Sequence, residues 1–308
     1  MQNYAPIVLF VYNRPAHTKR LYESLLISSE AKDSILYIVS DGPKEKDIDK
    51  VSEVRKLIHS FDGFKEVIVI ERESNWGIEK SEQEAITDIV NKHGKIICLE
   101  DDIVVNRHFL HYMNEALNKF EGSERVYSVT GYTYAKLNED YPESYFTALP
   151  SSWGWGTWAD KWNKLKMPVD IEDFRNIYRD RKLQKRLDCF GAYPWFQMLA
   201  VRYKNTNELT WDLCWHLAIQ KNNGIILTPR SSLCINAGFD GSGVHHKAEK
   251  SEPDRVDDDF CVSEYPTEEE INSRAFKTIR KQMRKKRGFV KLMKERYFLL
   301  FKKFRYYI

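Results

Sequence analysis

Cysteine is sparse in this chain. Five cysteines occur among 308 residues, and they lie far apart in the sequence. No two of them form a Cys-x-x-Cys pair, so the sequence offers neither the ligand spacing of a structural zinc site nor a framework of disulfides. Free thiols in such numbers suit a reducing compartment, which favours a cytoplasmic protein.

Signals for export or membrane insertion are also missing. The first residues contain no basic stretch and lead directly into a predicted strand at 6–12. No apolar run approaches the roughly 20 residues that a membrane-spanning helix needs. We therefore expect neither a signal peptide nor a membrane-spanning segment.

A glycine-rich phosphate loop is absent after the first predicted strand. The chain there reads Asn13-Arg14-Pro15, where a dinucleotide-binding enzyme has a Gly-x-Gly-x-x-Gly turn. This absence argues against a dinucleotide dehydrogenase. It also speaks against a nucleotidyltransferase, which stays open as an alternative because it too combines such a fold with acidic metal ligands.

Charge is distributed unevenly along the chain. The formal net charge is +3, yet residues 274–308 hold fourteen Lys or Arg and a single acid, Glu295. This segment therefore carries about +13 and the remainder about −10. Such a split predicts a basic appendage with a partner of its own.

Apolar runs alternate with amphipathic helical patterns in the first half. The sequence predicts helices at 16–29, 51–61 and 79–92 between strands at 6–12, 35–39, 67–70 and 95–99. Four strands alternating with helices predict an α/β fold with a mostly parallel sheet and right-handed crossovers. A helix near 107–120 and a strand at 126–130 follow before the alternation stops.

Three consecutive acids follow the fourth predicted strand. Glu100, Asp101 and Asp102 come directly after an apolar run, and ligands of open α/β sheets bind at the carboxyl ends of the strands. Adjacent carboxylates repel one another unless a cation is present. We therefore predict a hard divalent cation that bridges to a phosphate; the alternative is an acidic turn after a core strand.

Tryptophan is concentrated in the second half. All tryptophans but Trp76 lie between residues 140 and 215. Aromatic rings stack on sugars, and they also fill cores. For a single tryptophan we favour the core, but we interpret the Gly-flanked pair Trp153 and Trp155 as the wall of a site. Trp211-Asp212 begins a predicted helix, where Asp212 could equally be an ordinary N-cap.

These patterns divide the chain into four parts. Residues 1–135 and 136–250 are interpreted as two halves of one domain, followed by an acidic linker at 251–273 and the basic segment 274–308. The stretch 238–246 contains three glycines, an aspartate and two histidines, which favours a flexible loop that closes over a charged ligand.

Six short motifs, in order, resemble the nucleotide-sugar glycosyltransferases of the GT-A fold. They are most similar to the N-acetylglucosaminyltransferase I group and, more broadly, to the bacterial family-2 glycosyltransferases. The motifs are Asn13-Arg14-Pro15, Asp41-Gly42, Glu100-Asp101-Asp102, Trp153-Gly154-Trp155, Trp211-Asp212 and Gly243-Val244-His245-His246. The resemblance covers roughly residues 6–246. It implies a Rossmann-like sheet with a donor half and a Trp-rich acceptor half.

The resemblance also implies a role for each motif. Asp102 would bind Mn²⁺ or Mg²⁺, and His246, or failing that His245, would reach the metal or the diphosphate from the closing loop. Asp212 would be the general base of an inverting transfer. The implied donor-binding residues are Asn13, Arg14, Asp41, Glu100 and Asp101. The implied acceptor-binding residues are Trp153, Trp155 and Trp211.

The implied activity is the metal-dependent transfer of a hexosyl or N-acetylhexosaminyl group from a UDP-sugar. The acceptor would be a hydroxyl of a glycan or lipid-linked glycan, as in the synthesis of bacterial surface polysaccharides. A non-catalytic carbohydrate-binding protein is the alternative outside the enzymes, but it leaves the acidic triplet unexplained.

The basic segment 274–308 reads as an amphipathic helix interrupted near Gly288. One interpretation is peripheral attachment to the anionic inner face of the plasma membrane. The other is packing against the acidic body of the same chain. A nucleic-acid partner is not expected, since no recognised binding motif accompanies the charge.

Overall fold

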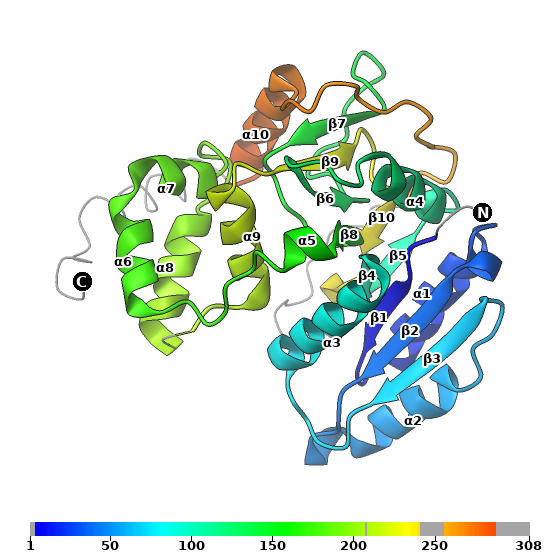
Figure 1. The fold of residues 1–308 in the computed structure, drawn as a ribbon. Coiled ribbons are helices and arrows are strands. Elements are labelled where there is room, and N and C mark those ends of the chain that lie inside the picture. Colours follow the sequence, from blue (N-terminus) through cyan, green and yellow to red (C-terminus); the bar gives the residue numbers. More distant parts are fainter. Residues whose placement is uncertain (1–3, 207, 241–255, 288–308) are drawn as a thin grey trace.

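An eight-stranded sheet forms the centre of the molecule. The computed structural model describes residues 4–206, 208–240 and 256–287. The strand order is β3-β2-β1-β4-β8-β6-β9-β7, and helices cover both faces (Figure 1). The bounds are β1 Ile7–Val11, β2 Ile35–Ser40, β3 Glu66–Glu71, β4 Lys95–Glu100, β6 Val126–Thr130, β7 Ser144–Thr147, β8 Trp155–Trp158 and β9 Ile225–Pro229.

Most of this sheet is parallel. Strands β1 to β4 run in one direction, β6 and β9 share that direction, and β8 and β7 run against it. A short antiparallel pair, β5 (Ile103–Val105) with β10 (Cys234–Asn236), lies outside the main sheet. The predicted α/β class with a mostly parallel, helix-flanked sheet is confirmed.

The two sheet faces bury two separate apolar clusters. Along β1, alternate residues point to opposite faces: Ile7 and Leu9 join helices α1 (Pro15–Leu26), α2 (Ile48–Ile58) and α4 (Phe109–Lys119). Val8 and Phe10 join α3 (Ile78–His93) and α9 (Trp211–Lys221) on the other face. Burial on both faces explains why these strands read as continuous apolar runs.

A helical lobe extends beyond α9 at the left of Figure 1. It contains α6 (Ile171–Arg179), α7 (Arg181–Leu187) and α8 (Trp195–Thr206), which share an apolar cluster with the side of α9 that faces away from the sheet. The short helix α5 (Ala159–Trp162) connects β8 to this lobe. The lobe therefore supports α9 from the side opposite to the sheet.

Strand β8 lies antiparallel between β4 and β6, where the sequence predicts no strand. Gly156 makes this close pairing possible, because a Cβ atom there would lie 2.7 Å from the backbone oxygen of Ile96. The position therefore requires glycine for packing reasons. Insertion of β8 extends the sheet from the predicted first half into the Trp-rich half.

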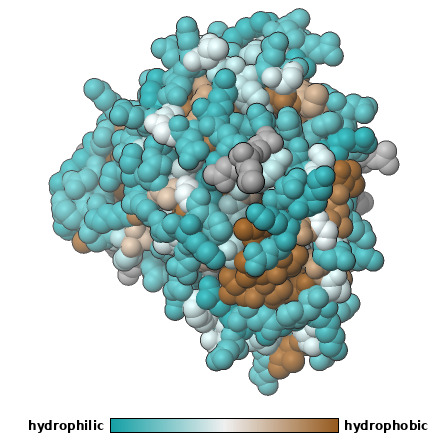
Figure 2. Space-filling view, turned by 45° about the vertical axis from the view of Figure 1, so that its right-hand side comes forward, coloured by the Kyte–Doolittle hydropathy of each residue, from teal (hydrophilic) through white to brown (hydrophobic). Residues whose placement is uncertain are grey.

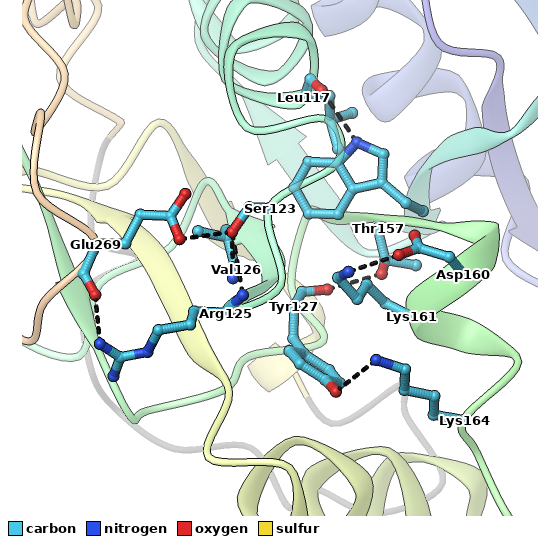
Figure 3. Close-up of polar contacts among 11 residues, drawn as sticks. Leu117, Ser123, Arg125, Val126, Tyr127, Thr157, Asp160, Lys161, Lys164 and Glu269 are labelled. Carbon is cyan, nitrogen blue, oxygen red and sulfur yellow. Dashed lines mark hydrogen bonds and ion pairs between the residues drawn. The ribbon is translucent and has the colours of Figure 1, made fainter.

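The segment 256–272 is bound to the body at several points. Asn106 Nδ2 donates to the backbone oxygens of Asp257 and Phe260 at 2.9 and 3.0 Å. Near β6, Ser123 Oγ donates to Glu269 Oε2 at 2.7 Å and Arg125 donates to the backbone oxygen of Glu269 at 2.8 Å (Figure 3). The described part of the expected linker therefore follows the surface of the domain.

Helix α10 (Ser273–Arg287) covers the described start of the basic segment. Its apolar residues Ala275, Phe276, Ile279 and Met283 are buried in a cluster with residues of β7 and the turn near Cys189. Packing on the body, the second of the two interpretations, thus applies to these residues; residues 288–308 lie outside the described part. No helix in the described ranges combines the length and the apolar character needed to cross a bilayer.

The outer edge of the sheet is apolar at β3. Figure 2 turns this side forward and shows a largely hydrophilic face with a hydrophobic patch in its lower half. Residues 67–70 of β3 are half-buried, and exposed Glu66 and Glu71 bound them. Charged ends of this kind are a common way to limit pairing at a free strand edge.

Protonation of His216 should destabilise the fold. This buried residue of α9 makes a 2.7 Å hydrogen bond from Nε2 to the backbone oxygen of Leu187, and burial lowers its pKa to about 4. Because the unfolded chain binds the proton more readily, stability falls as the pH drops from about 6.5 to about 4. In urea titrations at pH 7 and 4.5, we expect this residue to account for a loss of about 2 to 3 kcal/mol.

The variant His216→Gln retains a donor for the Leu187 oxygen without the titration. It should lose that much less stability than the wild type between the two pH values. Equal losses in the two proteins would contradict the assignment.

Candidate functional site

The acidic triplet lies at the carboxyl edge of the parallel strands. Glu100 ends β4, where it pairs with Phe10 of β1, and the buried residues Asp101 and Asp102 form the turn into β5. Arg14 follows β1 and Asp41 follows β2 along the chain. The parallel arrangement therefore brings these residues of three sequence segments to one edge of the sheet.

Arg14 is the cation that the structure places against the acids. Its guanidinium contacts both Asp101 and Asp102, with 3.1 Å between Arg14 Nη1 and Asp102 Oδ2. The second oxygen of Asp101, Oδ2, is buried and has no hydrogen-bond partner among the described residues. A buried carboxylate oxygen without a partner is costly, and it can accept a further donor or a metal ion.

The positive charge of Arg14 is too small to neutralise the three acids. Burial and repulsion from Asp102 and Asp101 raise the pKa of Glu100 to about 8. Burial also raises the pKa of Asp101 to about 6, although Arg14 opposes this shift. One guanidinium does not offset three crowded carboxyls, so the site favours an additional cation.

Residues at the end of β10 and just after it enclose Asp102 from the other side. Asn236 Nδ2 donates to Asp102 Oδ1 at 3.3 Å, and the backbone N–H of Ala237 donates to the backbone oxygen of Asp102 at 2.7 Å. At Gly238, a Cβ atom would lie only 2.4 Å from Asp102 Oδ2. Sequence reasoning missed Asn236 as part of this site, whereas Gly238 was predicted only as the first residue of the Gly-rich loop at 238–246. The position of Asn236 just before that loop was the available signal.

Asp41 uses both of its carboxylate oxygens to order the loop that follows β3. Oδ1 accepts from the backbone N–H groups of Gly42 and Trp76, both at 2.9 Å. Oδ2 accepts from Gly77 N–H at 2.9 Å and from Asn75 Nδ2 at 3.1 Å. With both oxygens used in this way, Asp41 orders the loop at the end of β3. Asp41 therefore has little capacity left for the direct contact with the nucleotide donor that the resemblance implies.

Asn13 also acts within the protein. Its Nδ2 donates to Asp47 Oδ1 at 2.9 Å, and Tyr12 donates to Asp47 Oδ2 at 3.1 Å. These bonds tie the end of β1 to the turn that precedes α2. Asn13 therefore shapes the edge on which Arg14 stands.

Asp212 stands in the first turn of α9 with an exposed side chain. Its charge contributes to the raised pKa of Glu100 on β4 and of Glu79 and Glu82 on α3. Asp212 and the acidic triplet are thus electrostatic neighbours at one edge of the sheet. Sequence reasoning missed Glu79 and Glu82, because helical position alone did not distinguish them from other helix acids.

Two of the three predicted acceptor-binding tryptophans lie in the core. Trp155 and Trp211 are 2% and 6% exposed, and their rings stack with centroids 5.6 Å apart. Trp162 and Trp215 complete this cluster. The interpretation of Trp155 as a site wall is corrected, because its ring packs against other tryptophans in the core. Little ring surface is left for a sugar on either Trp155 or Trp211.

Trp153 has a different environment. It is half-buried, and its ring centroid lies 4.7 Å from that of Tyr132 and 5.8 Å from that of Phe239. Phe239 follows Gly238, so this aromatic group borders the enclosure of Asp102. Of the predicted wall residues, Trp153 is the one with exposed ring surface. His246 lies outside the described residues.

The donor set around the acids fits a cation only in part. Within residues 4–206, 208–240 and 256–287, no group of three or more His, Cys, Asp or Glu side chains converges as a metal site. Asp101 and Asp102 would supply two carboxylates. Mg²⁺ commonly takes its remaining ligands from water and substrate phosphates. The residues therefore suit a cation that binds together with a diphosphate.

Replacing Gly238 by Ala should weaken cation binding at Asp102. The added methyl group would meet Asp102 Oδ2 and displace the carboxylate. We expect the affinity for Mn²⁺ in the presence of nucleoside diphosphate to fall about tenfold, or about 1.4 kcal/mol. Titration followed by Mn²⁺ electron paramagnetic resonance measures this affinity, with Ser52→Ala at an exposed position of α2 as a remote control. Unchanged Mn²⁺ affinity in Gly238→Ala would show that Asp102 takes no part.

Several solved structures are distantly similar to this chain. No protein-family model and no curated protein matches the chain. The S. aureus TarS 1–349 structure is 12% identical with a TM-score of 0.39, over 75% of this chain and 59% of that one. The matched part spans 21% of the longer TarS structure, at 15% identity and a TM-score of 0.31 over 41% of this chain.

Two further solved structures are similar at the same low level. Mannosyltransferase PcManGT from Pyrobaculum calidifontis, in complex with GDP-Man and Mn²⁺, is 11% identical with a TM-score of 0.39, over 71% of this chain and 87% of that one. A cytidylyltransferase from Leptospira borgpetersenii is 14% identical with a TM-score of 0.34, over 52% and 63%. Similarity this low says nothing about activity, and the fold described above rests on the strand order itself.

Proposed function

We propose that this protein is a glycosyltransferase of the GT-A type that uses a nucleotide sugar, with UDP as the nucleotide. One observation carries the proposal: Asp212 at the start of α9 lies close enough to the acidic triplet after β4 for its charge to raise the pKa of Glu100 at the carboxyl edge of the sheet. A sugar transfer needs a group that handles the diphosphate and a base that handles the acceptor, and this edge supplies candidates for both.

The donor side is built from the first half of the chain. Arg14, Asp101 and Asp102 would hold the diphosphate end, and the loop ordered by Asp41 would border the nucleoside. Positive charge is available there, since Arg72 Cζ and Lys80 Nζ lie 3.9 and 4.4 Å from the ring centroid of Trp76. Mn²⁺ or Mg²⁺, held by Asp102 and Asp101, would stabilise negative charge on the leaving diphosphate.

Asp212 would act on the acceptor side. Its exposed carboxylate can take the proton of an acceptor hydroxyl, and a single base opposite the leaving group suits an inverting displacement. The exposed part of the Trp153 ring offers an apolar face for a glycan. Hexosyl or N-acetylhexosaminyl transfer in polysaccharide synthesis is the corresponding physiological proposal.

Membrane attachment is a separate part of the proposal. Helix α10 buries its apolar face on the body but exposes basic residues such as Lys281, Lys285 and Lys286. These charges could bring a cytoplasmic enzyme to an anionic membrane surface that carries a lipid-linked acceptor. The role proposed for residues 274–308 is therefore electrostatic.

Nucleotide binding tests the donor side. We expect UDP with Mn²⁺ to raise the melting temperature more than GDP, CMP or dTDP, because at equal concentration a tighter ligand stabilises the folded state more. The shift should need Mn²⁺ and should disappear in Asp102→Ala. If no nucleotide stabilises a well-folded sample under any condition, the donor site is refuted.

Replacing Asp212 by Asn tests the base. We expect kcat for sugar transfer to fall at least about 100-fold, the usual range for loss of a general base, while binding of UDP with Mn²⁺ is retained. Asp88→Asn changes another exposed acid and should leave kcat unchanged. A nucleotidyltransferase or a binding protein would be indifferent to Asp212→Asn, so full activity in that variant would contradict the proposal.

A further inference from the structure

The start of α9 is capped by another helix. Thr210 occupies the N-cap position, yet its side chain makes no capping hydrogen bond. Instead, Glu79 Oε2 of α3 accepts from the backbone N–H of Trp211 at 2.8 Å. One turn further along α3, Glu82 Oε2 accepts from the indole Nε1–H of Trp211 at 2.7 Å. The α3 carboxylate pair, Glu79 and Glu82, therefore accepts from both N–H groups of Trp211, the residue before Asp212.

The contact is buried and continues to the acidic strand. Glu82 is only 4% exposed, and the Trp211 ring stacks on Trp155. Trp155 pairs with Cys98 of β4, two residues before Glu100. Through these packed residues, the first turn of α9 is fixed against the strand that carries the acidic triplet.

A carboxylate at the start of α9 stabilises the helix N-terminus, but the indole N–H of Trp211 does not require a carboxylate. Two other tryptophans satisfy their indole N–H with neutral oxygens: Trp158 with the Leu117 backbone oxygen at 3.0 Å and Trp162 with Thr87 Oγ1 at 2.9 Å. Glu79 and Glu82 instead add acids beside Glu100 and Asp212. Burial, together with repulsion from Glu100, Glu79 and Asp212, raises the pKa of Glu82 well above its usual value. Such an electrostatically unfavourable arrangement is typical of functional sites.

We propose that Glu79 and Glu82 are positioning residues that fix Asp212 relative to the donor site. The inference rests on the proposed function, since it assigns Asp212 the role of base. Neither residue needs to touch substrate: they set the place and direction of the first turn of α9. Loss of this contact should lower turnover and leave donor binding intact, because Arg14, Asp101 and Asp102 lie on other elements.

Substitutions at Glu82 test this role with a built-in conservative control. Glu82→Gln keeps an acceptor oxygen for the Trp211 indole and should retain kcat within about threefold. Glu82→Leu leaves the indole N–H unpaired and should lower kcat about 10- to 100-fold, as expected for a small displacement of a reacting group. KM for the UDP-sugar should change less than twofold. Asp88→Leu, at an exposed position of the same helix, should have no effect.

A second variant guards against simple misfolding. Adding Trp211→Phe to Glu82→Leu removes the unpaired donor, and removal of both partners costs less than removal of one. The double variant should fold more stably than Glu82→Leu alone but should keep its low kcat, because the contact that fixes α9 is still missing. If Glu82→Leu keeps full kcat, or if it loses UDP binding in parallel with kcat, the positioning role is overturned.

Hydrogen exchange separates this inference from the proposed function. Amides 211–214 should exchange faster in Glu82→Leu than in the wild type or in Glu82→Gln. If the wild type transfers no sugar, the proposed function fails, while that exchange pattern would still support control of the α9 start by Glu82. Unchanged exchange in Glu82→Leu would overturn the inference whatever the activity.

Discussion

Repulsion among carboxylates at the carboxyl edge of the sheet is the constraint on which the rest of this structure depends. Glu100, Asp101 and Asp102 follow β4, Glu79 and Glu82 project from α3, and Asp212 begins α9. Arg14 offsets part of this charge through its contacts with Asp101 and Asp102. Burial limits the screening of Glu82, Asp101 and Asp102 by water, so their charges repel one another strongly and attract a cation.

The fold holds these groups together in spite of their repulsion. Apolar clusters on both faces of the sheet fix the strand ends from which the acids emerge. Four packed tryptophans hold α9 against β8 and so against β4. Crowding of like charges lowers the stability of the fold, a cost that functional sites commonly carry.

Much of the donor half could be predicted from the sequence. Continuous apolar runs with intervening amphipathic helices define β1 to β4, and the position of the acids after β4 then follows from the topology. The edge location of Arg14 and Asp41 was predictable for the same reason. These predictions succeed because each depends on local periodicity and one general rule of parallel sheets.

The remaining features depend on contacts between distant residues. The bonds of Asp41 to the N–H groups of Trp76 and Gly77 join residues about 35 positions apart, and backbone donors leave no mark in a sequence. The burial of Trp155 arises from its three tryptophan neighbours, and β8 is short and lies between strands that are predicted separately. Glu79 and Glu82 look like any acids at the start of a helix until α9 is placed against them.

The location of bound Mn²⁺ tests the central claim most directly. Crystals grown with UDP and MnCl₂ would reveal the ion by anomalous scattering at the manganese edge. We predict one strong peak beside Asp102 and Asp101, in contact with the diphosphate and on the side that faces Asp212. A diphosphate bound elsewhere on the protein, or a manganese peak away from these acids, would contradict this prediction.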